Sequence, residues 1–249
     1  YSRIIEHFPS GGGGYVVATK LLGSRWGVLS GAALLVDYVL TITISIASGA
    51  DAIFSLLAPH WAAYKLPAEA AALGVLTLLN VRGVKESVTA LAPIFMTFVV
   101  THAFMLAAVM GGHVGDIPVV SHEVATSVRG TIGALGLFGT FKLFVRAYSL
   151  GGGTYTGIEA VSNGIGIMRE PRVQTGKRTM TLMALSLAVT AGGILLAYLL
   201  LHIAPERGKT MNAVLFERFA DHWTLGGLRV GHAFVWLALV SEGALLFVA

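Results

Sequence analysis

The stretch SLGGGTYTGIEAVSNG, residues 149–164, differs from the long apolar runs on either side of it, because it holds three consecutive glycines, two threonines and a glutamate. A glycine inside a helix costs about 1 kcal/mol relative to alanine, so three in a row favour a break. Non-helical backbone at membrane depth is tolerated only where it is buried in protein or lines a watery cavity. The stretch therefore predicts a broken helix: one half near 135–150, an unwound link at 151–154, and a second half over 155–168.

The composition of the 249-residue chain places this break inside a membrane. Hydrophobic residues make up 55% of the chain and charged residues 12%, and the mean hydropathy is +0.76, whereas a soluble domain carries about a quarter charged residues. A membrane-spanning helix needs about 20 mostly apolar residues. The predicted spans are residues 26–50, 67–81 (a shorter run), 88–110, 132–168, 180–203 and 230–249. We therefore expect an all-α, polytopic protein with one transmembrane domain over residues 1–249 and the lipid bilayer as its surroundings.

Positive charge is concentrated in alternate connections between these spans. Three short segments hold nine Lys and Arg residues, namely Arg3, Lys20, Arg25, Arg82, Lys85, Arg169, Arg172, Lys177 and Arg178. Positive charge in short loops marks the cytoplasmic side of a membrane protein. We therefore expect a plasma-membrane protein with segments 1–25, 82–87 and 169–179 in the cytoplasm. The cations are scattered along the chain rather than gathered on one basic face, so no nucleic-acid partner is expected.

Glu159 is the strongest candidate functional residue in the opening stretch. An ionised carboxylate at the centre of a membrane helix costs about 2.5 kcal/mol or more, so such a residue is a functional candidate by default. One alternative is that Gly151, Gly152 and Gly153 only let a neighbouring helix pack closely. This alternative explains the glycines but not the glutamate. A second alternative is that Glu159 forms a structural salt bridge with another helix.

The first span carries a matching set of oxygen atoms in LLVDYVLTITISIASGAD, residues 34–51. Asp37, Thr41 and Ser45 are spaced at i, i+4 and i+8, and Tyr38 lies three residues before Thr41, so all four project from one side of a helix. The stripe offers a carboxylate, a phenol and two hydroxyls. The alternative is that the hydroxyls bond back to carbonyls of their own helix, which leaves Asp37 unpaired.

Other polar residues give weaker signals. His102, inside the third span, is interpreted as a hydrogen-bonded structural residue rather than a proton relay, and the sequence does not assign Glu242 a role. Lys142 and Arg146 either partner a buried acid or extend to the membrane surface. The eight histidines lack zinc-ligand spacing, and no pattern of hydrolytic residues is present, so neither an enzyme nor a cofactor is expected. GGGGYVVATK, residues 11–20, is interpreted as a glycine hinge rather than a phosphate loop.

Three runs in order, FPSGGGGYVVATKLLGSRWG, LLVDYVLTITISIASG and TYTGIEAVSNGIGIMREP, with KRTM downstream, together resemble the amino acid–polyamine–organocation (APC) superfamily. The resemblance implies the LeuT fold, which has inverted repeats of five helices. The chain then covers about the third to the eighth helix, the broken helix is the sixth, and we expect a fragment without the first helix and the C-terminal helices. Within the superfamily the chain is most similar to KimA-type proton-coupled potassium importers, relatives of the KUP family.

This resemblance implies a function and a site. The implied substrate-binding residues are Asp37, Tyr38, Thr41, Ser45, Thr156 and Glu159, and the implied potassium ligands among them are Thr41, Ser45, Thr156 and Glu159. Several oxygens and a carboxylate suit a potassium ion, whose hydration shell they replace. We expect a secondary-active transporter for proton-coupled potassium uptake, with potassium and protons as the transported species, and a homodimer is kept open. The alternative is an amino-acid or amine permease of the same superfamily, in which free amides at Gly151–Gly153 bind the substrate carboxylate.

Overall fold

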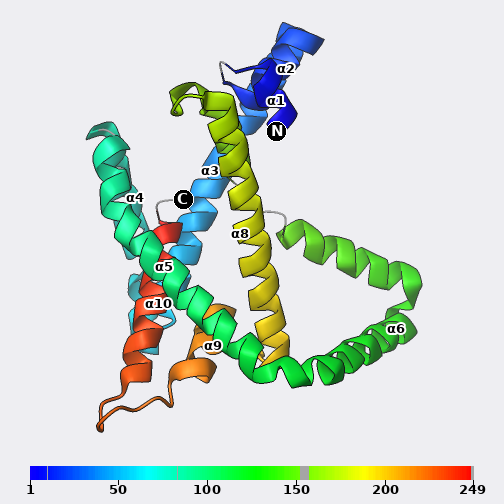
Figure 1. The fold of residues 1–249 in the computed structure, drawn as a ribbon, viewed down its shortest axis with the longest axis vertical. Helices are drawn as coiled ribbons and strands as arrows, with labels where there is room; N and C mark the ends of the chain where they lie inside the picture. Colours follow the sequence, from blue (N-terminus) through cyan, green and yellow to red (C-terminus); the bar gives the residue numbers. More distant parts are fainter. Residues whose placement is uncertain (10, 83, 152–156, 248–249) are drawn as a thin grey trace. The chain divides into compact units, whose positions relative to one another are not determined.

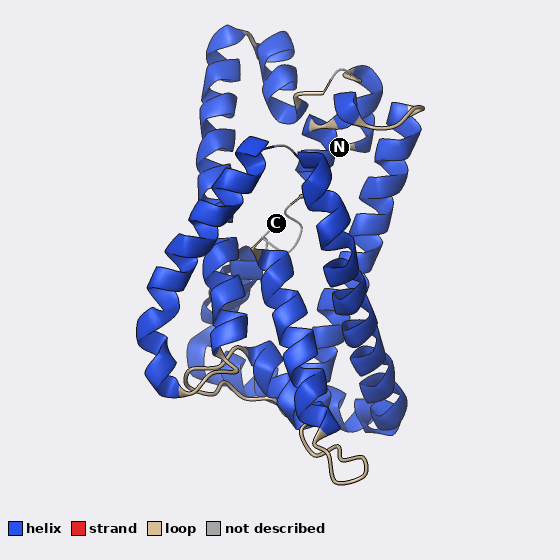
Figure 2. Cartoon of the chain, turned by 90° about the vertical axis from the view of Figure 1, so that its left-hand side faces the viewer, coloured by secondary structure: helices blue, strands red, loops and turns tan. Residues whose placement is uncertain are grey.

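The computed structural model describes residues 1–9, 11–82, 84–151 and 157–247. Figure 2 shows helices joined by loops, and within the described residues the only β-type pairing is an isolated bridge between Leu225 and Leu228. The predicted all-α class is confirmed. The helices are α1 (Ser2–His7), α2 (Gly13–Leu22), α3 (Ser24–Phe54), α4 (Lys65–Arg82), α5 (Val84–His113), α6 (Ile117–Gly151), α7 (Ile158–Asn163), α8 (Arg172–Leu200), α9 (Met211–Ala220) and α10 (Val230–Leu246), with 3₁₀ turns η1 (Pro59–Tyr64), η2 (Val114–Asp116) and η4 (Ile165–Ile167).

Three predicted spans are continuous helices, because α3, α5 and α8 each run through their predicted span or nearly so. By length and apolar composition, three helical segments of the described chain can cross a membrane: Ser24–Phe54, Ala92–Gly151 and Arg172–Leu200. Helix α8 ends at Leu200, three residues before the predicted limit at residue 203. Helix α10 is apolar as predicted, but it is shorter than these three segments.

The region around the predicted break differs from expectation. Residues 111–131, which lie between two predicted spans and were expected to form a loop, are mostly helical. The turn η2 leads directly into α6, and there Ser121, Thr126 and Thr131 donate to carbonyls of their own helix. Within α6 the backbone turns at Gly136, with φ 70° and ψ 170°. The predicted second half over 155–168 is also too long, since α7 ends at Asn163 and only a 3₁₀ turn follows.

The break itself is only partly described. Helix α6 ends at Gly151, and Gly157 has a left-handed backbone with φ 100° immediately before α7. This conformation is one that glycine adopts readily and other residues rarely do, so α7 starts as a separate helix. The remainder of the predicted unwound link, residues 152–154, lies outside the described residues together with Tyr155 and Thr156.

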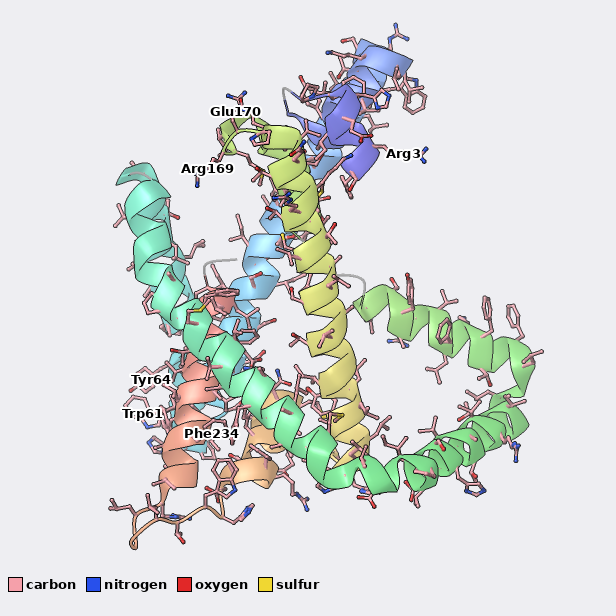
Figure 3. All side chains as sticks on the ribbon, viewed as in Figure 1. Arg3, Trp61, Tyr64, Arg169, Glu170 and Phe234 are labelled. Atoms are coloured by element: carbon pink, nitrogen blue, oxygen red, sulfur yellow. The ribbon has the colours of Figure 1, made fainter. Side chains whose placement is uncertain are left out.

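The chain forms two compact units. Unit 1 comprises Tyr1–Tyr38 and Pro118–Gly193, and unit 2 comprises Val39–Ile117 and Ile194–Ala249. In unit 1, α1 and α2 pack against α7, and a small core forms around Ile5, Ile165 and Met180. An ion pair between Lys177 of α8 and Glu6 of α1 fastens the first helix, and the hydrogen bond from Lys177 lowers the pKa of Glu6. Figure 3 labels Arg169 and Glu170 in the turn before α8.

In unit 2, α10 packs against α5 and α9 (Figure 1). Helices α3 and α10 approach at backbone distance, because a Cβ atom added at Gly49 would lie 2.8 Å from the carbonyl oxygen of Gly243, and the reverse substitution would be equally close. An aromatic cluster connects α5, α9 and α10 around Phe234 of α10 (Figure 3). Its members are Phe104, Phe216, Phe219, Trp223 and Phe234.

Candidate functional site

Glu159 lies in the first turn of α7 and is half-buried. The hydroxyl of Tyr1 donates a hydrogen bond of 3.3 Å to Oε2 of Glu159. Burial and the neighbouring Glu159 carboxylate raise the pKa of Tyr1, so its phenol stays protonated as a donor. The carboxyl group of Asp37 on α3 interacts electrostatically with that of Glu159. Two ionised carboxylates at this proximity repel, so a proton or a cation between them is favoured.

Asn163, at the other end of α7, connects this helix to α3. Its Nδ2 donates a hydrogen bond of 2.7 Å to the hydroxyl of Tyr38. Asn163 follows Glu159 by four residues, so both side chains lie on one face of α7. Tyr38 likewise follows Asp37 directly on α3. Two contacts therefore join α7 to α3 within unit 1, one between acids and one between an amide and a phenol.

The glycine run before α2 packs directly against Asn163. The N–H of Gly12 donates to the carbonyl of Asn163 at 3.2 Å. Gly11 and Gly13 have φ of 89° and 48°, and a Cβ at Gly13 would lie 1.9 Å from Oδ1 of Asn163. The run, interpreted from the sequence as a hinge, thus has a close-packing role: it lets the chain pass Asn163 at a distance that a side chain would prevent.

A cavity of about 150 Å³ opens beside Glu159. Its lining comes from α2, α3, α7 and the first residue of the chain, and consists of Tyr1, Gly14, Tyr15, Ser30, Leu34, Glu159 and Asn163. Most of these residues offer an oxygen or an amide group. The cavity therefore has a mixed polar and apolar wall that contains one carboxylate.

Thr41 and Ser45 continue the same stripe along α3 into unit 2. Tyr38, Thr41 and Ser45 are all half-buried, whereas Val39, Leu40 and Ile44 on the other sides of the helix are exposed. Tyr38, Thr41 and Ser45 therefore lie on the more covered side of α3, whereas Asp37 is exposed. Among the described residues the hydroxyls of Thr41 and Ser45 have no hydrogen-bond partner.

The neighbouring Thr43 behaves differently, because it donates to the carbonyls of Val39 and Leu40 in its own helix. Back-bonding to the helix, the alternative account of the stripe, thus describes Thr43 and not Thr41 or Ser45. Among the other predicted site residues, Gly151 ends α6, and Gly152, Gly153 and Thr156 lie outside the described residues. Lys142 and Arg146 are exposed on α6.

Sequence reasoning missed Asn163, Tyr15, Ser30 and Tyr1. Two of them had a signal in their spacing. Asn163 is one helical turn beyond Glu159, and Ser30 lies two turns before Tyr38 on the same stripe of α3. Tyr1 and Tyr15 had no such signal, because they reach Glu159 and the cavity only through the packing of α1 and α2 against α7.

The model of a family described as "Amino acid permease" matches residues 5–245. The chain belongs to this family. The predicted superfamily is thereby confirmed, and membership of the amino acid permease family indicates a multi-pass protein of the plasma membrane.

One curated relative is the potassium transporter KimA of Bacillus subtilis (strain 168). It is 35% identical over 200 residues, a stretch that covers 80% of this chain and 32% of the relative. The chain thus spans about a third of the length of that relative. Membership of the amino acid permease family and similarity to a transporter both indicate transport rather than enzymatic catalysis.

Proposed function

We propose that the full-length protein is a secondary-active transporter that imports potassium together with protons. The observation that carries this proposal is the approach of the Asp37 and Glu159 carboxyl groups within unit 1. Two acids that interact electrostatically attract a cation, and one of them can also hold a proton. The similarity to a potassium transporter supports potassium as the cation.

Each acid has its own role in this proposal. Glu159 follows the break that the sequence predicts, and carbonyls freed by such a break would complete the shell of a cation, so Glu159 is the cation ligand. Asp37, one turn before Thr41, is the proton carrier. With the cation on Glu159 and the proton on Asp37, both can be bound at the same time, and any effect of one on the affinity for the other is reciprocal. Thr41 and Ser45 supply further oxygens along α3.

The test uses the full-length protein in a strain that lacks potassium uptake and is grown on low potassium. Glu159→Gln should weaken potassium uptake at every pH, because it removes the charged ligand. Asp37→Asn should leave cation binding partly intact and abolish the dependence of uptake on the proton gradient. If both variants import potassium like the wild type, neither acid carries the coupling and the proposal fails.

The chain offers a matched control pair on α3. Thr41→Val removes a hydroxyl without a partner among the described residues and should lower the apparent affinity for potassium. Thr43→Val removes a hydroxyl that bonds to its own helix, and it should leave uptake unchanged. Equal effects of the two substitutions would contradict a role for the stripe.

Amino-acid or amine uptake is the second candidate function, and the family description favours it. In that case the cavity beside Glu159 holds the amino group of the substrate next to the carboxylate. Proteoliposomes with the full-length protein distinguish the two candidates. Accumulation of labelled amino acids without potassium uptake would favour the permease, and potassium or rubidium uptake without amino-acid uptake would favour the importer.

A further inference from the structure

Glu242 of α10 belongs to a row of hydrogen-bonded polar side chains in unit 2. The hydroxyl of Tyr198 donates to Oδ1 of Asn212, and Nδ2 of Asn212 donates to Oε1 of Glu242 at 2.8 Å. The other carboxylate oxygen, Oε2, lies 3.8 Å from Nε2 of His102. Four side chains from α8, α9, α10 and α5 thus form one continuous row in the interior.

This row is enclosed by apolar groups. The His102 side chain is 2% exposed and that of Glu242 is 13% exposed. The rings of Phe98 and Phe216 lie 3.9 Å and 4.9 Å from the imidazole ring, measured between centroids. Within the described residues, Oε2 of Glu242 and Nε2 of His102 have no hydrogen-bond partner. A buried polar atom without a partner destabilises the folded state, so a group that bonds both of these facing atoms is favoured.

The hydrogen bonds of His102 determine what that group is. Nδ1 lies 3.0 Å from the backbone carbonyl of Phe98 and 3.3 Å from the hydroxyl of Thr101. The carbonyl only accepts, and the Thr101 hydroxyl donates to carbonyls of its own helix, so we assign a hydrogen to Nδ1. A neutral His102 then presents the lone pair of Nε2 to Glu242. If Glu242 is ionised as well, two electron-rich atoms face each other in the core. One additional proton turns this repulsion into a hydrogen bond, on either Nε2 or Oε2.

We propose that Glu242 and His102 form a proton-binding site that holds one exchangeable proton between Oε2 and Nε2 and fastens α10 to α5. With the proton bound, the pair is either a carboxylic acid donating to an imidazole or an imidazolium donating to a carboxylate. Both forms have zero net charge and satisfy both atoms. Release of the proton leaves a net negative charge and two facing lone pairs, which weakens the contact between α5 and α10.

The surrounding titratable groups are engaged elsewhere or lie outside this row. In the elements packed against the pair, Lys65 is paired with Asp51 and Glu69, Glu217 with Lys209, and His232 with Asp221 and Trp236. His113 contacts the carbonyl of Val109, and Arg218 and Asp116 are exposed. Tyr198 faces Glu242 only through Asn212 and, as a neutral phenol, supports the carboxylate end of the row.

This site would be a second place at which the transporter responds to protons. Asp37 and Glu159 belong to unit 1, whereas His102 and Glu242 belong to unit 2. The link to transport rests on the proposed function, but binding of the proton does not. The experiment below therefore measures the proton directly, in purified full-length protein and without potassium uptake as a readout.

The first measurement follows the thermal unfolding of the detergent-solubilised protein as a function of pH. The slope of stability against pH reports the difference in bound protons between the folded and unfolded states. In the wild type, melting temperature should fall as pH rises through the titration of the pair. Glu242→Gln and His102→Gln should each remove this part of the pH dependence, because an amide forms a hydrogen bond in that place but does not take up the proton.

Tyr198→Phe is the matched control, since it removes the far end of the same hydrogen-bonded row and leaves the acid and the imidazole in place. It should lower the melting temperature by a similar amount at every pH and keep the wild-type slope. If Glu242→Gln and His102→Gln behave like Tyr198→Phe, with a uniform loss and an unchanged slope, the row is a structural network and the proposal is wrong.

A second measurement needs no substitution, which guards against variants that do not fold. In protein labelled with ¹⁵N-histidine, one imidazole should keep its Nδ1 protonated while its Nε2 changes between proton-bound and free states with pH. A spectrum in which no buried histidine shows this change would overturn the proposal. A pair that titrates in a protein without potassium uptake would instead leave the proton site in place and reject potassium as the transported ion.

Discussion

At the scale of residues, spacing along a helix indicated part of the candidate site and tertiary contacts supplied the rest. The sequence singles out Asp37, Tyr38 and Glu159. Acids inside an apolar span are unfavourable in lipid and are therefore candidates for a functional site, and Tyr38 lies next to one of them. Asn163 contacts Tyr38, and its importance depends on glycines more than 140 positions away along the chain, which no local pattern reveals. The roles assigned to these residues stay predictions.

Gly13 gives a direct test of that contact. Gly13→Ala would place a Cβ 1.9 Å from Oδ1 of Asn163, and overpacking of this kind costs roughly 1–3 kcal/mol. We expect a lower melting temperature of the full-length protein, partly restored when Asn163→Ala is added. The control is Gly14→Ala, where no atom lies within 4 Å of the added Cβ, so its melting temperature should be unchanged or slightly higher. Additive losses in the double variant would contradict the contact.

At the scale of elements, the apolar runs predicted α3, α5 and α8, because long hydrophobic stretches leave few alternatives to a helix in lipid. The same reasoning failed for α6. Its first half is rich in Ser, Thr and charged residues and resembled a loop, yet those hydroxyls bond back to the helix. The turn at Gly136 was not predicted, because nothing in the sequence distinguishes this glycine from its neighbours at positions 130, 133 and 139.

Gly136 and Gly133 can be told apart by substitution. The backbone of Gly136, with φ 70° and ψ 170°, lies in a region that only glycine occupies without strain, and other residues pay about 1–3 kcal/mol there. Gly136→Ala should therefore lower the melting temperature or straighten α6, which would show in distances between spin labels at its two ends. Gly133→Ala, in regular helix with open space around it, should be neutral or stabilising by up to about 1 kcal/mol. The same response at both positions would rule out a turn at Gly136.

At the scale of the whole molecule, composition and the alternation of basic loops predicted a multi-pass plasma-membrane protein, and membership of the amino acid permease family confirms this class. Which loops face the cytoplasm stays a prediction. The distribution of charge across the membrane, rather than contacts within the protein, sets its orientation.

The absence of cysteine from the 249 residues makes the orientation measurable. Two exposed positions suit single substitutions. Arg172→Cys lies in a segment expected to be cytoplasmic, and Arg207→Cys lies in the connection after α8, which the alternation of loops places outside. In intact cells a membrane-impermeant maleimide should label the cysteine at position 207 and spare the one at 172, and opened cells should label both. Labelling in the reverse order would invert the predicted topology.

The crossing of α3 and α10 has a consequence for how this sequence can change over generations. Gly49 and Gly243 each occupy the space that a side chain on the other would need, so neither codon can drift to alanine while the helices keep their separation. The side chains of Phe247 and Ile53 also crowd these positions, but at each of them one obstacle is the backbone carbonyl of the opposite glycine, so no side-chain change on the partner can remove it. Each glycine is therefore constrained separately, and either can be replaced only after the two helices have moved apart.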